Sequence, residues 1–172
     1  MVPVARFERV SASVFANDWE KKASACLGSL PDISGIPLPR RATSGSAGYD
    51  FFAPAGFTLP CGESVLIPTG IRALISDGWF LAVFPRSGLG FRYRLQLDNS
   101  VGIIDSDYAL SDNEGHFMLK LNNDGREGKP LTVAAGSAVA QGIFLPYGIT
   151  FDDDAQAQRN GGFGSTDGKP GR

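Results

Sequence analysis

Residues 101–108 have the sequence VGIIDSDY, in which a short apolar run is followed by two carboxylates and an aromatic residue. The apolar run predicts a strand at residues 101–104, and positions two apart in an extended chain face the same side. Asp105 and Asp107 would therefore share one face if the strand continues. A carboxylate at the end of a buried strand can orient a water molecule. The alternative is a strand that runs into a turn, because Asp and Ser are common turn residues.

The sequence on either side of this stretch predicts more short strands. The chain has 172 residues with 22 glycines and 11 prolines, so residues that favour turns are frequent. Phe117, Leu119 and Leu121 alternate with other residues, which is typical of a half-buried strand. The pattern predicts an all-β fold, a jelly-roll β-sandwich or barrel. The predicted strands are residues 49–53, 64–67, 71–75, 79–84, 101–104, 116–121, 131–134 and 138–146.

The two ends of the chain differ from this pattern. Residues 11–27 predict one short helix, with Ser11 or Ser13 as its cap and Gly28 as its stop. Residues 160–172 are polar and rich in glycine, which predicts a mobile tail. We therefore divide a single domain into three parts: a helical segment with a linker (1–37), a β domain (38–150) and a flexible arm (151–172).

Composition and charge exclude several classes of function. The formal net charge is −2, which gives no reason to expect nucleic acid or an anionic membrane as a partner. Cys26 and Cys61 are the only cysteines and His116 is the only histidine, so neither a disulfide framework nor a histidine-rich metal cluster is expected. No signal peptide or spanning apolar run is evident, and we expect a cytoplasmic protein.

Five short segments carry patterns more specific than ordinary turns. They are SGSAGYD (44–50), PRSGLG (85–90), VGIIDSDY (101–108) with the preceding Asn99, GSAVAQGIF (136–144) and RNGGFGST (159–166). In this order they resemble the five motifs of the trimeric dUTPase (deoxyuridine triphosphate nucleotidohydrolase) family, over about residues 38–168. The resemblance implies a jelly-roll homotrimer with active sites at subunit interfaces. It also implies magnesium-dependent hydrolysis of dUTP to pyrophosphate and dUMP, the precursor for thymidylate synthesis.

The second and fourth segments suit phosphate binding. The guanidinium of Arg86 offers forked donors, and glycines let backbone N–H groups approach an anion closely. By resemblance, Arg86, Ser87 and Gly88 hold the α- and β-phosphates, and Gln141 lies beside them. The alternatives are a polar turn with a surface arginine and, for Gln141, a satisfied polar group in the core.

The third segment suits recognition of uracil, which accepts a hydrogen bond at O4 and donates one from N3. An asparagine or a strand backbone supplies both partners. By resemblance, Asn99 and the backbone of Ile103 and Ile104 contact the base, the backbone near Met118 closes the pocket, and Tyr108 lies under the deoxyribose. The alternatives are a turn residue for Asn99 and a core aromatic for Tyr108.

The reaction needs a base and charge stabilisation. Asp105 is the candidate base, which would orient a water molecule toward the α-phosphorus. Mg²⁺ often binds through substrate phosphates, so no dedicated protein cage is expected. Asp50 would contribute indirectly, through metal-bound water, and its alternative is a solvated carboxylate at a strand end.

The fifth segment resembles an arm that closes over the nucleotide. Phe163, between glycines, suits stacking on the base. By resemblance, Arg159, Gly164, Ser165 and Thr166 complete the site at the γ-phosphate, on a neighbouring subunit. The alternative is a disordered tail.

The sequence departs from the family pattern at three places. Residues 109–113 look like an insert after Tyr108, followed by the sequence EGH at 114–116. Arg159 is four residues before Phe163 instead of the usual five. Asp167 replaces a glycine beside the expected γ-phosphate site, where its charge would be repelled.

Two other functions remain open. The first is a dCTP deaminase, for which Glu114 would be the base. The second is a nucleotide-sensing regulatory protein, in which residues 1–37 or the insert would contact a partner.

Overall fold

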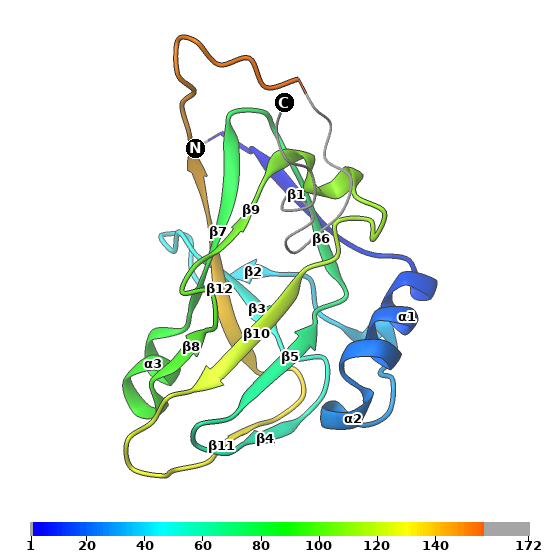
Figure 1. Cartoon of the computed structure of the whole chain (residues 1–172), viewed down its shortest axis with the longest axis vertical. Helices are drawn as coiled ribbons and strands as arrows, with labels where there is room; N and C mark the ends of the chain where they lie inside the picture. The colour runs from blue at the N-terminus through cyan, green and yellow to red at the C-terminus, as the bar shows by residue number, and fades with distance from the viewer. Residues whose placement is uncertain (1, 157–172) are drawn as a thin grey trace.

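The computed structural model describes residues 2–156, and these residues form short antiparallel strands with a few helices (Figure 1). Each strand is bounded by turns, as the frequent glycines and prolines predict. The strands are β1 (Ala5–Arg9), β2 (Arg40–Arg41), β3 (Tyr49–Phe52), β4 (Phe57–Leu59), β5 (Ser64–Pro68), β6 (Ile71–Ile75), β7 (Trp79–Pro85), β8 (Leu95–Leu97), β9 (Gly102–Ile104), β10 (Met118–Asn123), β11 (Leu131–Val133) and β12 (Ala138–Pro146). The helices are α1 (Ala12–Lys22), α2 (Ser24–Leu27) and α3 (Ser87–Tyr93), with the 3₁₀ turns η1 (Ile33–Gly35) and η2 (Ser106–Leu110).

The strands form four antiparallel sheets around one core. The largest has the order β2-β3-β12-β7-β9, and a second has the order β5-β10-β8. Two further pairs, β1 with β6 and β4 with β11, complete the framework. The predicted all-β jelly-roll fold is confirmed, and its apolar side chains pack into a single buried cluster.

The alternation predicted around residue 119 is present in part of β10. Leu119 and Leu121 are buried and Lys120 between them is exposed, but Met118 is buried as well, so the alternation holds only from Leu119 onward. The prediction that this strand begins at residue 116 is wrong, because β10 begins at Met118 and His116 precedes it in a loop.

The N-terminal helix is interrupted where the sequence predicts one continuous helix. Ser11 caps α1 by accepting a hydrogen bond from the backbone N–H of Val14. Ala23 leaves helical geometry, with φ −132° and ψ −24°, and separates α1 from α2. Gly28 ends α2 with a φ of +76° and a ψ of −145°, a conformation that glycine adopts without strain.

Several elements were not predicted from the sequence. Strand β1 carries two arginines and a glutamate, which weakens any apolar signal, yet it pairs with β6 over its whole length. Helix α3 contains two glycines, and because glycine is a poor helix former the sequence predicts no helix there. Strands β2, β4 and β8 have only two or three residues each.

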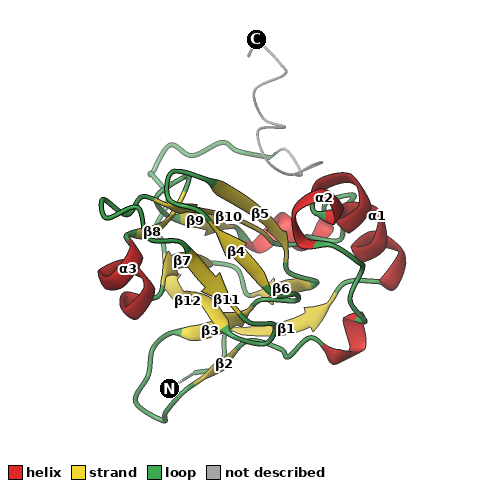
Figure 2. Cartoon of the chain, turned by 90° about the horizontal axis from the view of Figure 1, so that it is seen from below, coloured by secondary structure: helices red, strands yellow, loops and turns green. Residues whose placement is uncertain are grey.

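The helices lie at opposite sides of the sheets. Helices α1 and α2 lie on one side and α3 lies on the other (Figure 2). Helix α1 contacts β5, so the N-terminal segment packs directly on the strand framework. In the part of the chain that the structure describes, no helix is long and apolar enough to cross a membrane.

Candidate functional site

In residues 101–108, the strand ends before the two carboxylates. Strand β9 stops at Ile104, and Asp105 is the extended residue (φ −77°, ψ 160°) that precedes η2. Asp107 lies in the first turn of η2, so the two carboxylates do not share a strand face. The turn alternative is therefore correct for this segment, and it places Asp105 where the strand edge meets the turn.

Strand β9 lies at the end of its sheet. One of its edges pairs with β7, with Val83 opposite Gly102 and Leu81 opposite Ile104. Within residues 2–156, no strand pairs with its other edge. An unpaired strand edge presents alternating N–H donors and C=O acceptors, the pattern that a flat heterocycle with one donor and one acceptor can match.

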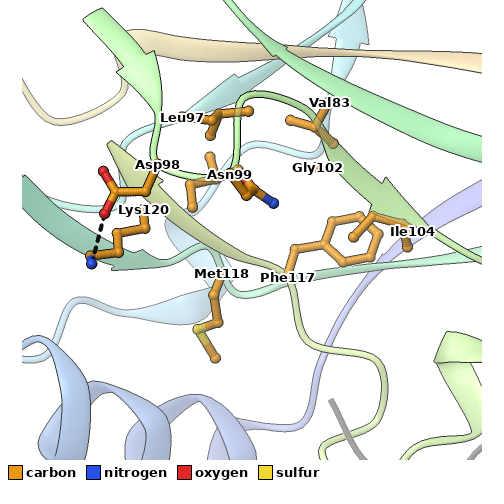
Figure 3. A pocket seen from close by; sticks show the side chains of 10 residues that line it. Val83, Leu97, Asp98, Asn99, Gly102, Ile104, Phe117, Met118 and Lys120 are labelled. Carbon is orange, nitrogen blue, oxygen red and sulfur yellow. Dashed lines mark ion pairs between the residues drawn. The ribbon is translucent and has the colours of Figure 1, made fainter. Parts of the chain in front are cut away.

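A cavity of about 160 Å³ lies beside this region and is mainly apolar. Its lining brings together residues from β7, β9, β10 and the turn that precedes β9, and Figure 3 shows the amide of Asn99 within it. Lys120 forms an ion pair of 2.6 Å with Asp98 at its rim. Asn99, Ile104 and Met118, which are expected to bind the base, line this cavity. Val83, Gly102 and Phe117 also line it.

A second hollow, of about 360 Å³, lies where β7 ends and α3 begins. It is lined by Arg86, Ser87 and Gly88, the three residues expected at the phosphates, and also by Arg92 of α3. Arg92 is not among the residues that the sequence predicts at the phosphates, because it reaches the hollow only through the helical geometry of α3. Two arginines beside glycine backbone form a suitable surface for an anion.

The side chains expected near the phosphates form an ion pair and a hydrogen bond within this region. Nε of Arg86 lies 3.1 Å from Oδ1 of Asp50, and Nε2 of Gln141 donates to the carbonyl oxygen of Pro85 at 3.3 Å. Gln141 also has Gly48 beside it, where an added Cβ would lie only 2.9 Å from Oε1 of Gln141. The glycine in SGSAGYD therefore leaves room for the amide, and the first, second and fourth segments meet here.

Comparison with known proteins assigns the family. The dUTPase family model matches residues 34–167. A deoxyuridine 5'-triphosphate nucleotidohydrolase of Lactococcus lactis is 40% identical over 136 residues, 77% of this chain and 89% of the relative. One from Actinobacillus pleuropneumoniae serotype 5b is 45% identical over 138 residues, 75% of this chain and 86% of the relative. The chain belongs to the dUTPase family.

The solved structures agree with this assignment. A crystal structure of dUTPase from Streptococcus mutans matches with a TM-score of 0.61 and 30% sequence identity. The match covers 84% of this chain and 97% of that one. As a member of the dUTPase family, the chain is a hydrolase, and the predicted identity is confirmed.

Within one chain of this dUTPase, Asp105 and Arg86 lie apart. The pairing of Leu81 with Ile104 places Asp105 beside Phe80 at the start of β7. Arg86 follows the last residue of β7. At about 3.3 Å per residue, this run of strand separates Asp105 from Arg86 by roughly 20 Å. One subunit therefore does not bring both side chains to a single phosphorus atom.

Tyr108 is buried, with 6% of its surface exposed, and its ring stacks on Phe117 at 6.3 Å between centroids. Its hydroxyl donates to the backbone oxygen of His116 at 3.1 Å and accepts from Nδ2 of Asn113 at 3.2 Å. The residue expected under the sugar is thus anchored by the insert and by the segment that follows it.

The residue directly after the insert contacts the N-terminal segment. Oε2 of Glu114 accepts a hydrogen bond of 2.8 Å from the backbone N–H of Ser11. Hydrogen bonds from Ser11 hold the pKa of Glu114 below its ordinary value, so the carboxylate is ionised. Glu114 is the candidate base in the deaminase alternative, and this hydrogen bond directs its carboxylate toward the start of α1.

The described residues provide no protein cage for a metal ion. Within residues 2–156, no group of three or more His, Cys, Asp or Glu side chains is arranged to hold one. The carboxylate of Asp50 is paired with Arg86. The donors among the described residues fit Mg²⁺ as an ion that is carried by phosphates and keeps most of its water.

The predictions for the C-terminal arm fall on residues that the structure does not describe. Arg159, Phe163, Gly164, Ser165 and Thr166 all lie outside residues 2–156, as does Asp167. Their roles stay predictions.

Proposed function

We propose that this chain hydrolyses dUTP to dUMP and pyrophosphate, as a homotrimer whose active sites combine residues of different subunits. The observation that carries the proposal is the edge of β9 that pairs with no other described strand and lies beside the cavity lined by Asn99. The product dUMP would supply thymidylate synthesis, and the reaction would remove dUTP.

Base recognition would use the strand edge as a pairing partner. Backbone groups of Ile103 and Ile104, with the amide of Asn99, would donate to O4 of uracil and accept from its N3–H. The backbone near Met118 would close the other side of the cavity. Cytosine has the opposite pattern at these two positions, and a site that leaves buried polar groups unpaired rejects a ligand by about 10⁴–10⁵. Tyr108, held in place by its hydroxyl, would lie under the deoxyribose and leave no space for a 2′-hydroxyl.

Phosphate recognition would use the second hollow. The fork of Arg86 and the backbone of Ser87 and Gly88 would bind the α- and β-phosphates, with Gln141 beside them. Mg²⁺ bound to the phosphates would neutralise part of their charge, and Asp50 would reach it only through water. Arg159, Phe163 and the residues that follow would cover the γ-phosphate and the base.

The chemical step would be an in-line displacement at the α-phosphorus. Asp105 would hold a water molecule and take its proton while the water oxygen bonds to the α-phosphorus. The bond from that phosphorus to the α,β-bridging oxygen would break, and pyrophosphate would leave with its electron pair. Such a base contributes about 10²–10⁴ in rate, and the remaining acceleration would come from positioning and charge stabilisation.

The separation of about 20 Å between Asp105 and Arg86 within one chain supports the shared site. If both act on the same α-phosphate, Arg86 must come from a neighbouring subunit. A closed trimer supplies each site with one Asp105 and one Arg86 from different copies.

The experiment that tests the function is pyrophosphate release from dUTP with Mg²⁺, measured beside dCTP, dTTP and UTP. Release from dUTP alone would support both the reaction and the base pocket. Release from several nucleotides would contradict the roles of Asn99 and Tyr108, and no release from dUTP would contradict the proposed reaction.

A further inference from the structure

The N-terminal helix and the segment that follows the insert meet at a buried hydrogen bond between two side chains that are 98 positions apart. Nδ1 of His116 lies 2.7 Å from Oδ2 of Asp18, and the His116 side chain is fully buried. Asp18 also accepts from Nζ of Lys22 through its other oxygen, at 2.6 Å. A buried carboxylate is costly unless it is paired, so these contacts determine where α1 lies.

The hydrogen bonds define the protonation state of His116. Its Nε2 accepts from the backbone N–H of Gly70 at 2.8 Å, so this nitrogen carries a lone pair and Nδ1 carries the proton donated to Asp18. Burial lowers the pKa of His116 and outweighs the opposite effect of its hydrogen bond with Asp18. Burial raises the pKa of Asp18, but hydrogen bonds with Lys22 and His116 outweigh it and keep the pKa low. The pair is a neutral imidazole that donates to a carboxylate.

The same histidine contacts the residue expected at the sugar. The backbone oxygen of His116 accepts the hydroxyl hydrogen of Tyr108, and Asn113 donates to both groups, at 3.2 and 3.4 Å. One continuous set of hydrogen bonds therefore runs from Asp18 through His116 to Tyr108. Tyr108 lies in η2, the turn that begins directly after Asp105.

A second contact holds the same two segments together at the start of α1. Glu114 has a φ of +58°, an uncommon conformation for a residue with a side chain, and its carboxylate accepts the backbone N–H of Ser11. This contact places a negative charge beside the first turn of the helix, where the helix dipole favours it. In Figure 1, the loop that follows β9 comes close to the start of α1.

We propose that α1 is a positioning element for the sugar site: Asp18, acting through His116, and Ser11, acting through Glu114, hold the loop that carries Tyr108. The inference rests on the proposed function, because it assigns the selectivity for deoxyribose to the position of Tyr108. Neither Ser11 nor Asp18 lies within the region that the family model matches. Both are positioning residues and do not touch the substrate.

The test compares Asp18→Ala with Asp18→Asn and with a control on the same helix. The alanine variant loses the acceptor for Nδ1–H, whereas the asparagine variant keeps one of similar shape. Trp19→Phe is the control, because Trp19 is equally buried and donates from Nε1 to the backbone oxygen of Gly28, away from the loop. The readouts are kcat/KM for dUTP, kcat/KM for UTP and the melting temperature, at one protein concentration.

The selectivity ratio is kcat/KM for dUTP divided by kcat/KM for UTP. Asp18→Ala is expected to lower this ratio by about tenfold or more, since UTP gains access to a loosened site. Asp18→Asn is expected to restore most of this ratio. Trp19→Phe should lower the melting temperature and leave the ratio unchanged. Glu114→Ala, at a more exposed position, should change the ratio in the same direction as Asp18→Ala and provides the test if that variant does not fold.

An unchanged ratio in Asp18→Ala or Glu114→Ala, with an active wild type, would overturn this inference and leave the proposed function intact. A ratio that falls equally in Trp19→Phe would also overturn it, since the effect would then be general loosening of the helix. A wild type that does not hydrolyse dUTP would overturn the proposed function itself, and the inference with it.

Discussion

Asp105 and Arg86 stand at opposite ends of β7, roughly 20 Å apart along the strand. If the active site combines both residues, they come from different subunits. Two inactive variants should then complement each other: Asp105→Asn and Arg86→Ala, expressed together, should form mixed oligomers in which some sites have both native side chains.

Pyrophosphate release from the co-expressed pair, compared with each variant alone, measures this complementation. The control is two separately tagged copies of the same variant, which should stay inactive. If tag capture shows mixed oligomers and the pair is still inactive, the two residues do not act across an interface.

Asp105→Asn by itself should reduce kcat by about 10²–10⁴, because the amide cannot accept the proton of the attacking water. The substitution preserves shape, so calorimetric binding of a non-hydrolysable dUTP analogue should change little. A variant with near-native kcat would remove Asp105 from its role, and the neighbouring Asp107→Asn is the matched control for loss of one charge.

Arg86→Lys should raise KM for dUTP by about tenfold or more, because an ammonium group cannot make the forked contact of a guanidinium with phosphate oxygens. The lysine retains the charge that faces Asp50, so the melting temperature should change little. Arg94→Lys is the control, since Arg94 pairs with Asp124 on the surface, outside the second hollow. Equal KM values for both variants would contradict the assignment of the hollow to phosphates.

The melting temperature should fall as the pH decreases below about 6.5, the ordinary pKa of histidine. The folded protein holds the pKa of His116 below that value, so the unfolded chain binds a proton at a higher pH than the folded protein does. Proton binding then stabilises the unfolded state relative to the folded state. His116 is the only histidine in the chain, and the carboxylates with lowered pKa values titrate in a more acidic range.

His116→Gln should therefore flatten the dependence of melting temperature on pH between about pH 5 and 7. The variant will melt at a lower temperature overall, so the slope is the measured quantity. A slope equal to that of the wild type would show that His116 does not titrate in this way.

Gly115→Ala should destabilise the loop at Tyr108. Gly115 has a φ of +71°, and an added Cβ would lie 2.6 Å from Cα of Ala109 and 2.8 Å from the backbone oxygen of Tyr108. Gly62 is the matched control, with a φ of +83° and open space around the added atom. Gly62→Ala should cost about 1 kcal/mol, whereas Gly115→Ala should cost at least about 3 kcal/mol. Denaturant unfolding measures both, and equal losses would contradict the predicted backbone clash.

The sequence by itself determined the elements that depend on local pattern. Strands β6 and β12 have the predicted bounds, because apolar runs between turn residues leave few alternatives. Ser11 and Gly28 bound the N-terminal helical segment as expected, since capping and left-handed geometry are properties of single residues. The family also followed from the order of short segments, each of which is local.

Only the tertiary structure decided which distant residues meet. No local rule joins Asp18 to His116 or Ser11 to Glu114, because side chains far apart in sequence are brought together by packing of the whole sheet framework. The end of β9 before Asp105 also depended on context, since the same residues fit a strand or a turn. The contacts of the N-terminal segment with Glu114 and His116, which follow the insert, could therefore not be predicted from the sequence, and these contacts relate the segment to the sugar site.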